Sequence, residues 1–126
     1  MIRGIGVDLL RIARIEVMHE RNGAALARRI LGPRELKEYR TTRKKPAHYL
    51  ASAFAVKEAF AKALGTGFRG LSHRDAGVVR EANGRPVLVY SRALAARLKR
   101  EGITGGHVSL SDDGGFVCAY VVLEGL

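Results

Sequence analysis

The chain has 126 residues, of which 47% are apolar and 27% charged, a composition typical of one globular domain and not of a disordered chain. Its formal net charge of +10 comes mostly from arginine, so we expect an anionic partner: a nucleic acid, a nucleotide, an acidic protein or a membrane surface. A single cysteine excludes an internal disulfide and a cysteine-rich zinc site, and no apolar run approaches the roughly 20 residues of a membrane span.

The chain is expected to open with a short strand that ends at an acidic residue. Residues 2–7 are apolar apart from Arg3, and Gly4 and Gly6 indicate that another backbone approaches the strand closely. Asp8 follows at the C-terminal end of this strand. It is either a ligand-binding carboxylate or the N-cap of the next helix, and the local sequence leaves both open.

Three helices are predicted after the strand. The first spans residues 9–19, the second 24–31 after a turn at 22–23, and the third 33–39 after a Gly-Pro break. The first helix has a basic face, which is either solvated or a docking surface for an acidic helix. Its apolar side chains are expected to point inward: Leu9, Ile12, Ala13, Ile15 and Val17.

One long helix is predicted over residues 46–67, beginning at Pro46 and stopped by Gly65 and Gly67. Its apolar residues nearly encircle it, which is typical of a buried helix. Glu58 and Lys62 lie one turn apart within this apolar surround. They form either an ordinary i,i+4 salt bridge or a metal ligand beside a phosphate-binding lysine, and the helix alone does not distinguish these readings.

The second half of the chain is expected to be mainly strands. Asn-Gly at 83–84 predicts a hairpin of residues 76–81 and 86–90, and Ser91 is a good N-cap for a helix that ends near residue 100. Two strands follow at 107–111 and 116–123; the first places three polar side chains on one face, and the second is almost wholly apolar. Without repeats or linkers, residues 1–126 form a single α+β domain in which an antiparallel sheet packs with the long central helix.

Three separated blocks together resemble the holo-acyl-carrier-protein synthase family, the short bacterial type of 4′-phosphopantetheinyl transferase. They are GIGVD at the start, FAVKEAFAKALGTG in the middle, and HVSLS before a strand ending VVLE. The resemblance implies a cytoplasmic transferase of fatty acid biosynthesis. It would move 4′-phosphopantetheine from coenzyme A to a serine of apo acyl carrier protein and release adenosine 3′,5′-bisphosphate.

The resemblance also implies roles for particular residues. Asp8 and Glu58 match the ligands of a catalytic Mg²⁺, which binds through one or two carboxylates together with substrate phosphates. Lys62 and His107 match groups that contact the phosphates, so Glu58, Lys62 and His107 form the expected catalytic set. The general base is left open between Glu58 and a metal-bound water.

Further matches concern the two substrates and the assembly. For coenzyme A the expected contacts are Arg43, Lys44, Gly65, Thr66, Gly67 and His107, and for the carrier protein they are Arg14, Met18 and Arg21. The family resemblance implies a homotrimer with active sites between subunits, where Asp8 and Arg14 of one chain would lie near Glu58 and Lys62 of another. Both substrates are anionic, so they account for the net charge without nucleic acid or membrane.

Two positions depart from the family pattern. Ala53 stands where an arginine is common, and Asp112 stands where a histidine is common, so contacts with the nucleotide phosphates are placed in doubt at both. Arg43 or Lys44 is the expected substitute for the missing arginine. The alternatives are a basic nucleic-acid-binding module, drawn from the net charge, and a relative that has lost activity, drawn from these two departures.

Overall fold

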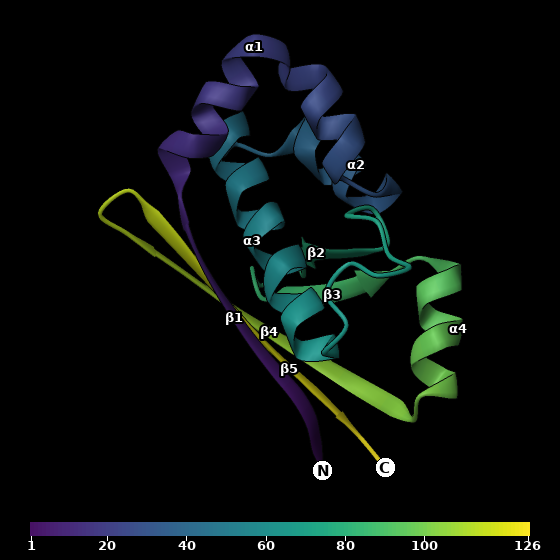
Figure 1. Ribbon diagram of the computed structural model, residues 1–126. Helices are drawn as coiled ribbons and strands as arrows, with labels where there is room; N and C mark the ends of the chain where they lie inside the picture. The colour runs from purple at the N-terminus through teal and green to yellow at the C-terminus, as the bar shows by residue number, and fades with distance from the viewer.

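The computed structural model describes residues 1–126 as four helices packed on two antiparallel sheets, which confirms the expected α+β class (Figure 1). The larger sheet has the order β1-β5-β4, and the smaller pairs β2 with β3. None of the helices is both long and apolar enough to cross a bilayer. The strands are β1 Ile2–Arg11, β2 Ala76–Arg80, β3 Pro86–Tyr90, β4 Ile103–Asp113 and β5 Phe116–Gly125, and the helices are α1 Ile12–Ile30, α2 Pro33–Thr41, α3 Pro46–Leu64 and α4 Arg92–Arg100.

Helix α3 is the centre of the fold, as the sequence predicts, and it lies across the inner face of the larger sheet (Figure 1). It begins with Pro46 in its first turn and ends at Gly65, which takes the left-handed conformation with φ 86°. Strand β1 packs directly against it. A Cβ at Gly4 would overlap the Ala63 carbonyl oxygen, and one at Gly6 would overlap that of Ala59. The predicted close backbone approach is therefore confirmed.

The smaller elements also follow their local signals. The β2–β3 hairpin turns through Gly84 with φ 88°, and Ser91 caps α4 by accepting a hydrogen bond from the Leu94 N–H at 3.1 Å. In the larger sheet β5 is the central strand, and its residues Val117 and Ala119 are fully buried against α3. The apolar strand predicted at 116–123 is therefore confirmed as central.

The sequence prediction is wrong at the junction of β1 and α1. The strand continues to Arg11, because residues 9–11 pair with Cys118, Val117 and Phe116 of β5. Leu9 is thus a strand residue that is 67% exposed, and Val17 on α1 is 53% exposed, so neither points inward. Asp8 lies within β1, and Arg11 is the N-cap of α1, which excludes Asp8 as the helix cap.

The expected turn at residues 22–23 is a kink and not a chain reversal. Helix α1 continues through it, with Asn22 in a non-helical conformation at φ −165° and ψ 70°. The Asn22 side chain accepts a hydrogen bond from the Ala25 N–H at 3.4 Å, as at the start of a new helix. The two predicted helices are therefore present but joined end to end.

The outer face of the larger sheet exposes several large apolar side chains, mainly from β1. Val7, Tyr120 and Ser109 are directly opposite one another on β1, β5 and β4, and they point away from α3. Ile5 and Val7 are 56% and 49% exposed on this face. Large apolar side chains exposed together on one sheet face are typical of an interaction surface.

Candidate active site

A lysine and an aspartate meet where β1 crosses the C-terminal half of α3. The Lys62 ammonium donates a hydrogen bond to the Val7 carbonyl oxygen at 2.9 Å, and its Nζ lies 3.4 Å from Asp8 Oδ1. Asp8 faces α3 because it follows Gly4 and Gly6 at the two-residue period of the strand. This contact forms within one chain, whereas the family resemblance implied that Asp8 of one chain lies near Lys62 of another.

Glu58 lies one helical turn before Lys62 and has a different partner. Its Oε1 is 3.5 Å from Nε2 of His73, in the loop that follows α3, and its side chain is 31% exposed. The ion pair of Lys62 is thus with Asp8, and the titratable side chain in contact with Glu58 is His73. The interpretation of Glu58 and Lys62 as an ordinary i,i+4 salt bridge is wrong.

Aromatic rings enclose the His73 side chain. Its ring stacks on Phe68 at a centroid distance of 4.2 Å and on Phe54 at 5.2 Å. The Arg14 guanidinium of α1 lies 5.9 Å from the centre of the Phe54 ring. The start of α1, the middle of α3 and the loop after it therefore meet around Glu58.

The donor set fits a hard divalent cation that is completed by substrate. Asp8 and Glu58 offer carboxylate oxygens, and Lys62 lies beside Asp8 and one helical turn from Glu58. No group of three histidine, cysteine, aspartate or glutamate side chains is arranged to hold a metal by itself. Mg²⁺ commonly binds through one or two carboxylates and substrate phosphates, so these two residues suit it when a diphosphate is present.

His107 is not brought to this site within one chain. It lies on β4 opposite Val122 of β5, on the outer face of the larger sheet, whereas α3 packs on the inner face. Its Nε2 is 2.9 Å from Glu124 Oε1, and this hydrogen bond lowers the pKa of the Glu124 carboxyl. The predicted catalytic set of Glu58, Lys62 and His107 is therefore split between two faces of the sheet.

The residues predicted to contact coenzyme A lie at both ends of α3. Arg43 and Lys44 are exposed in the loop before it, and the Gly65–Thr66–Gly67 turn follows it, about 28 Å away by helix rise. Arg97 of α4 donates to Thr66 Oγ1 at 3.0 Å and holds this turn in place. These residues do not form one pocket within the chain.

The two positions that depart from the family pattern lie near Lys44. Ala53 is buried at 1% exposure in the middle of the core. Lys44 and Arg80 line a small pocket together with Ala53, and both also line a pocket of about 150 Å³ that includes Asp112. The cationic side chains of Lys44 and Arg80 thus lie near Ala53, but the Asp112 carboxylate lines the larger of these pockets with them.

The predicted docking residues form one exposed row on α1. Arg14, Met18 and Arg21 are spaced by four and three residues, so they lie on one side of the helix, and all three are exposed. Arg14 joins this row to the site through its contact with Phe54.

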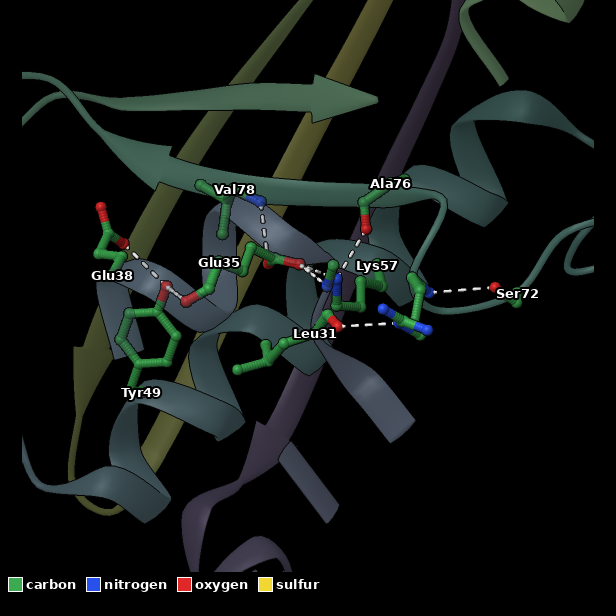
Figure 2. Close-up of polar contacts among 10 residues, drawn as sticks. Leu31, Glu35, Glu38, Tyr49, Lys57, Ser72, Ala76 and Val78 are labelled. Atoms are coloured by element: carbon green, nitrogen blue, oxygen red, sulfur yellow. Dashed lines mark hydrogen bonds and ion pairs between the residues drawn. The ribbon is translucent and has the colours of Figure 1, made fainter. Parts of the chain in front are cut away.

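A buried ion pair behind the site was not predicted from the sequence (Figure 2). The Lys57 ammonium donates to Glu35 Oε1 at 2.6 Å and to the Ala76 carbonyl oxygen at 2.7 Å, and the two side chains are 0% and 1% exposed. Glu35 also accepts hydrogen bonds from the backbone N–H groups of Gly32 and Val78, each at 3.1 Å. Burial lowers the pKa of the Lys57 ammonium, and the Glu35 carboxylate opposes that shift.

Signals for this pair were present in the sequence. Lys57 is a lysine in a helix that is apolar all round, and Gly77 is a glycine within a strand. The structure explains why residue 77 is a glycine, because a Cβ at this position would overlap the Glu35 carboxyl group. Burial of Lys57 required an acidic partner, but the sequence did not identify Glu35 as that partner.

Comparison with known proteins shows the family and the fold of the chain. The sequence profile of the 4′-phosphopantetheinyl transferase superfamily matches residues 4–121. Holo-[acyl-carrier-protein] synthases of Thiobacillus denitrificans and Photorhabdus laumondii are 50% and 48% identical to the chain over 98% of its length, and cover 95% and 98% of theirs.

Two solved structures of holo-[acyl-carrier-protein] synthases share the fold of the chain. The holo-[acyl-carrier-protein] synthase from Neisseria meningitidis matches with a TM-score of 0.92 at 46% identity, over 98% of this chain and 99% of that one. The Helicobacter pylori enzyme, solved in complex with coenzyme A, matches with a TM-score of 0.80 at 30% identity, over 95% and 99% of the two chains.

Proposed function

This chain belongs to the 4′-phosphopantetheinyl transferase superfamily as a holo-[acyl-carrier-protein] synthase, and we propose that its chemistry takes place where β1 crosses α3. The reaction moves 4′-phosphopantetheine from coenzyme A to a serine of an apo acyl carrier protein. The observation that carries the location is the Asp8–Lys62 contact of 3.4 Å, with Glu58 one turn away on the same helix. This arrangement offers two carboxylates and a cation at one place.

Asp8 and Glu58 are the residues that would hold Mg²⁺, together with the diphosphate of coenzyme A. When bound, the ion offsets negative charge on the diphosphate and makes the attacked phosphorus more electrophilic. Gly6 lets β1 approach α3 closely, and this approach keeps Asp8 near Lys62.

Lys62 is the residue positioned to receive the charge that develops on the leaving group. In the reaction the serine hydroxyl loses its proton to Glu58 or to a water, and its oxygen bonds to the β-phosphorus. The bond from that phosphorus to the bridging oxygen breaks, and adenosine 3′,5′-bisphosphate leaves with this oxygen and the extra negative charge. The Val7 carbonyl holds the Lys62 ammonium at 2.9 Å, while its side chain stays 55% exposed to an incoming phosphate. A cation fixed before the reaction stabilises such charge without reorganisation.

A homotrimer would complete the site with a second chain. Exposed apolar side chains of β1 on the outer face of the larger sheet, such as Ile5 and Val7, support burial between copies. His107 lies on that same face, so packing there would bring it towards a neighbouring copy and allow it to contact a phosphate of coenzyme A bound to that copy. This placement would reunite the predicted catalytic set across the interface.

The exposed row of Arg14, Met18 and Arg21 fits an acidic helix of the carrier protein. Two guanidinium groups flanking one flexible apolar side chain pair with carboxylates and an apolar residue between them. Because Arg14 also lies beside Phe54, a helix docked on this row would present its serine near Glu58. Two anionic substrates account for the net charge of +10, so a nucleic acid partner is not required. A cytoplasmic location stays a prediction.

The proposal is tested by a mass-gain assay. The protein is mixed with coenzyme A, Mg²⁺ and an apo acyl carrier protein, and the carrier protein is weighed by mass spectrometry. We expect the carrier to gain one phosphopantetheine, chelation of the metal to stop the gain, and Glu58→Ala to abolish it while the far-UV circular dichroism is unchanged. Absence of the gain with several carrier proteins would favour an inactive relative, and full activity of Glu58→Ala would exclude the metal role of Glu58.

A further inference from the structure

His73 lies outside the three motif blocks, yet its ring faces the carboxylate that is proposed to bind the metal. Its Nε2 is 3.5 Å from Glu58 Oε1. The Nε2 atom is itself buried and has no hydrogen-bond partner. A buried donor without a partner is costly, so this nitrogen needs an acceptor, and Glu58 is the acceptor at hand.

The surroundings of the ring restrict its motion. Phe54 and Phe68 stack on it at 5.2 and 4.2 Å, with interplanar angles of 11° and 26°. Phe54 precedes Glu58 by one helical turn on α3, so the Phe54 ring and the Glu58 carboxylate lie on the same face of the helix. The stack therefore limits rotation of the His73 ring away from Glu58.

The backbone on the C-terminal side of His73 is also anchored. Ser91 donates from Oγ to Asp75 Oδ1 at 2.7 Å, and the Ser72 N–H donates to Asp75 Oδ2 at 2.8 Å. The Ala76 carbonyl accepts the buried Lys57 ammonium (Figure 2). Lys57 is the residue before Glu58, so the same buried pair fixes both the helix that carries Glu58 and the strand that follows His73.

We propose that His73 is a positioning residue for Glu58: the imidazole donates its Nε2–H to Glu58 Oε1 and so orients the other oxygen towards the metal. The inference rests on the proposed function of this site. Carboxylate ligands of metals are commonly held by such hydrogen bonds, and removal of the partner typically weakens metal binding by about 10- to 100-fold. Catalytic hydrogen bonds are often long before substrate binds and tighten in the complex, so the 3.5 Å contact is compatible with this role.

The test compares two substitutions of His73 in the full chain. His73→Phe keeps a ring between Phe54 and Phe68 but removes the donor, and His73→Gln restores an N–H near the position of Nε2. The control is His48→Phe, the same exchange at a half-buried position in the first turn of α3. Binding of Mn²⁺ is measured by electron paramagnetic resonance of the free ion, with coenzyme A present and carrier protein absent, so that no turnover occurs.

We expect His73→Phe to weaken Mn²⁺ binding by about ten-fold, His73→Gln to recover most of it, and His48→Phe to match the wild type. In the complete reaction, His73→Phe should raise the Mg²⁺ concentration for half-maximal rate and leave kcat at saturating Mg²⁺ nearly unchanged.

Equal Mn²⁺ affinity of His73→Phe and the wild type would overturn the inference and leave the transferase proposal standing. If the wild type itself binds no Mn²⁺ with coenzyme A, the proposed metal role of Glu58 is overturned together with this inference. Thermal unfolding of His73→Phe, expected within a few degrees of the wild type, separates a lost hydrogen bond from a lost fold.

Discussion

Replacement of Lys57 by Met tests how much the buried pair contributes to the fold. The change removes the cation and keeps a flexible side chain of similar length, so Glu35 is left charged at 1% exposure with only two N–H donors. The Ala76 carbonyl loses its partner as well. Removal of one member of a buried ion pair costs about 3–5 kcal/mol, a large part of the roughly 5–15 kcal/mol that holds a typical domain folded.

The magnitude is measured by urea unfolding at fixed protein concentration. The double variant Glu35→Gln/Lys57→Met should be more stable than Lys57→Met alone, because no unpaired charge remains buried. Glu101→Gln is the control, since it breaks the exposed Arg97–Glu101 pair of 2.7 Å, and such a pair contributes about 0.3–0.5 kcal/mol. A loss below about 1 kcal/mol for Lys57→Met, or equal losses for the single and double variants, would refute the reasoning.

Three other expected outcomes follow from the same structure. Gly6→Ala should destabilise the fold by about 1–3 kcal/mol, measured by urea unfolding, and lower the transfer rate, because its Cβ would overlap the Ala59 carbonyl; an unchanged variant would contradict the packing. Burial raises the pKa of the Asp75 carboxyl, but hydrogen bonds from Ser72 and Ser91 outweigh it and lower the pKa overall. Its stabilisation is therefore present above the unfolded-state pKa and lost as the pH falls through the folded-state value, so the urea midpoint of the wild type should fall more between about pH 5 and pH 2 than that of Asp75→Asn. Ile5→Lys should leave the monomer fold intact and abolish assembly in analytical ultracentrifugation, whereas a trimer of this variant would contradict the role of the outer sheet face.

The parts of the fold that were predicted correctly depend on short-range signals. Pro46 and Gly65 set the ends of α3, and Ser91 caps α4, because each acts through its own backbone conformation or through a hydrogen bond to a near neighbour. The Asn-Gly turn of the β2–β3 hairpin has the same local character.

The prediction was wrong where a distant strand decides the structure. Residues 9–19 carry a helical pattern, but Leu9 pairs with Cys118 of β5, and this pairing extends β1 to Arg11. Hydrophobic periodicity within the segment contains no information about that partner. The same limit applies to the exposure of Leu9, which depends on which face of the sheet α3 covers.

In the candidate site, too, the residues within the motif blocks were predicted and their partners from distant segments were not. The motif blocks named Asp8, Glu58 and Lys62, and the structure brings Asp8 to Lys62. The partners Glu35 of Lys57 and His73 of Glu58 were not predicted, because each joins segments that only the tertiary fold brings together. The resemblance predicted that His107 contacts a phosphate, and this stays a prediction; its place on the outer face of the sheet depends on strand register.

The account depends most on a divalent cation held between Asp8 and Glu58. It is tested most directly by crystals of the protein grown with coenzyme A and Mn²⁺, with the anomalous signal of manganese used to locate the ion. We predict one peak within about 2.3 Å of a carboxylate oxygen from each of the two residues and of a diphosphate oxygen. A peak away from either carboxylate, with coenzyme A bound, would contradict the account.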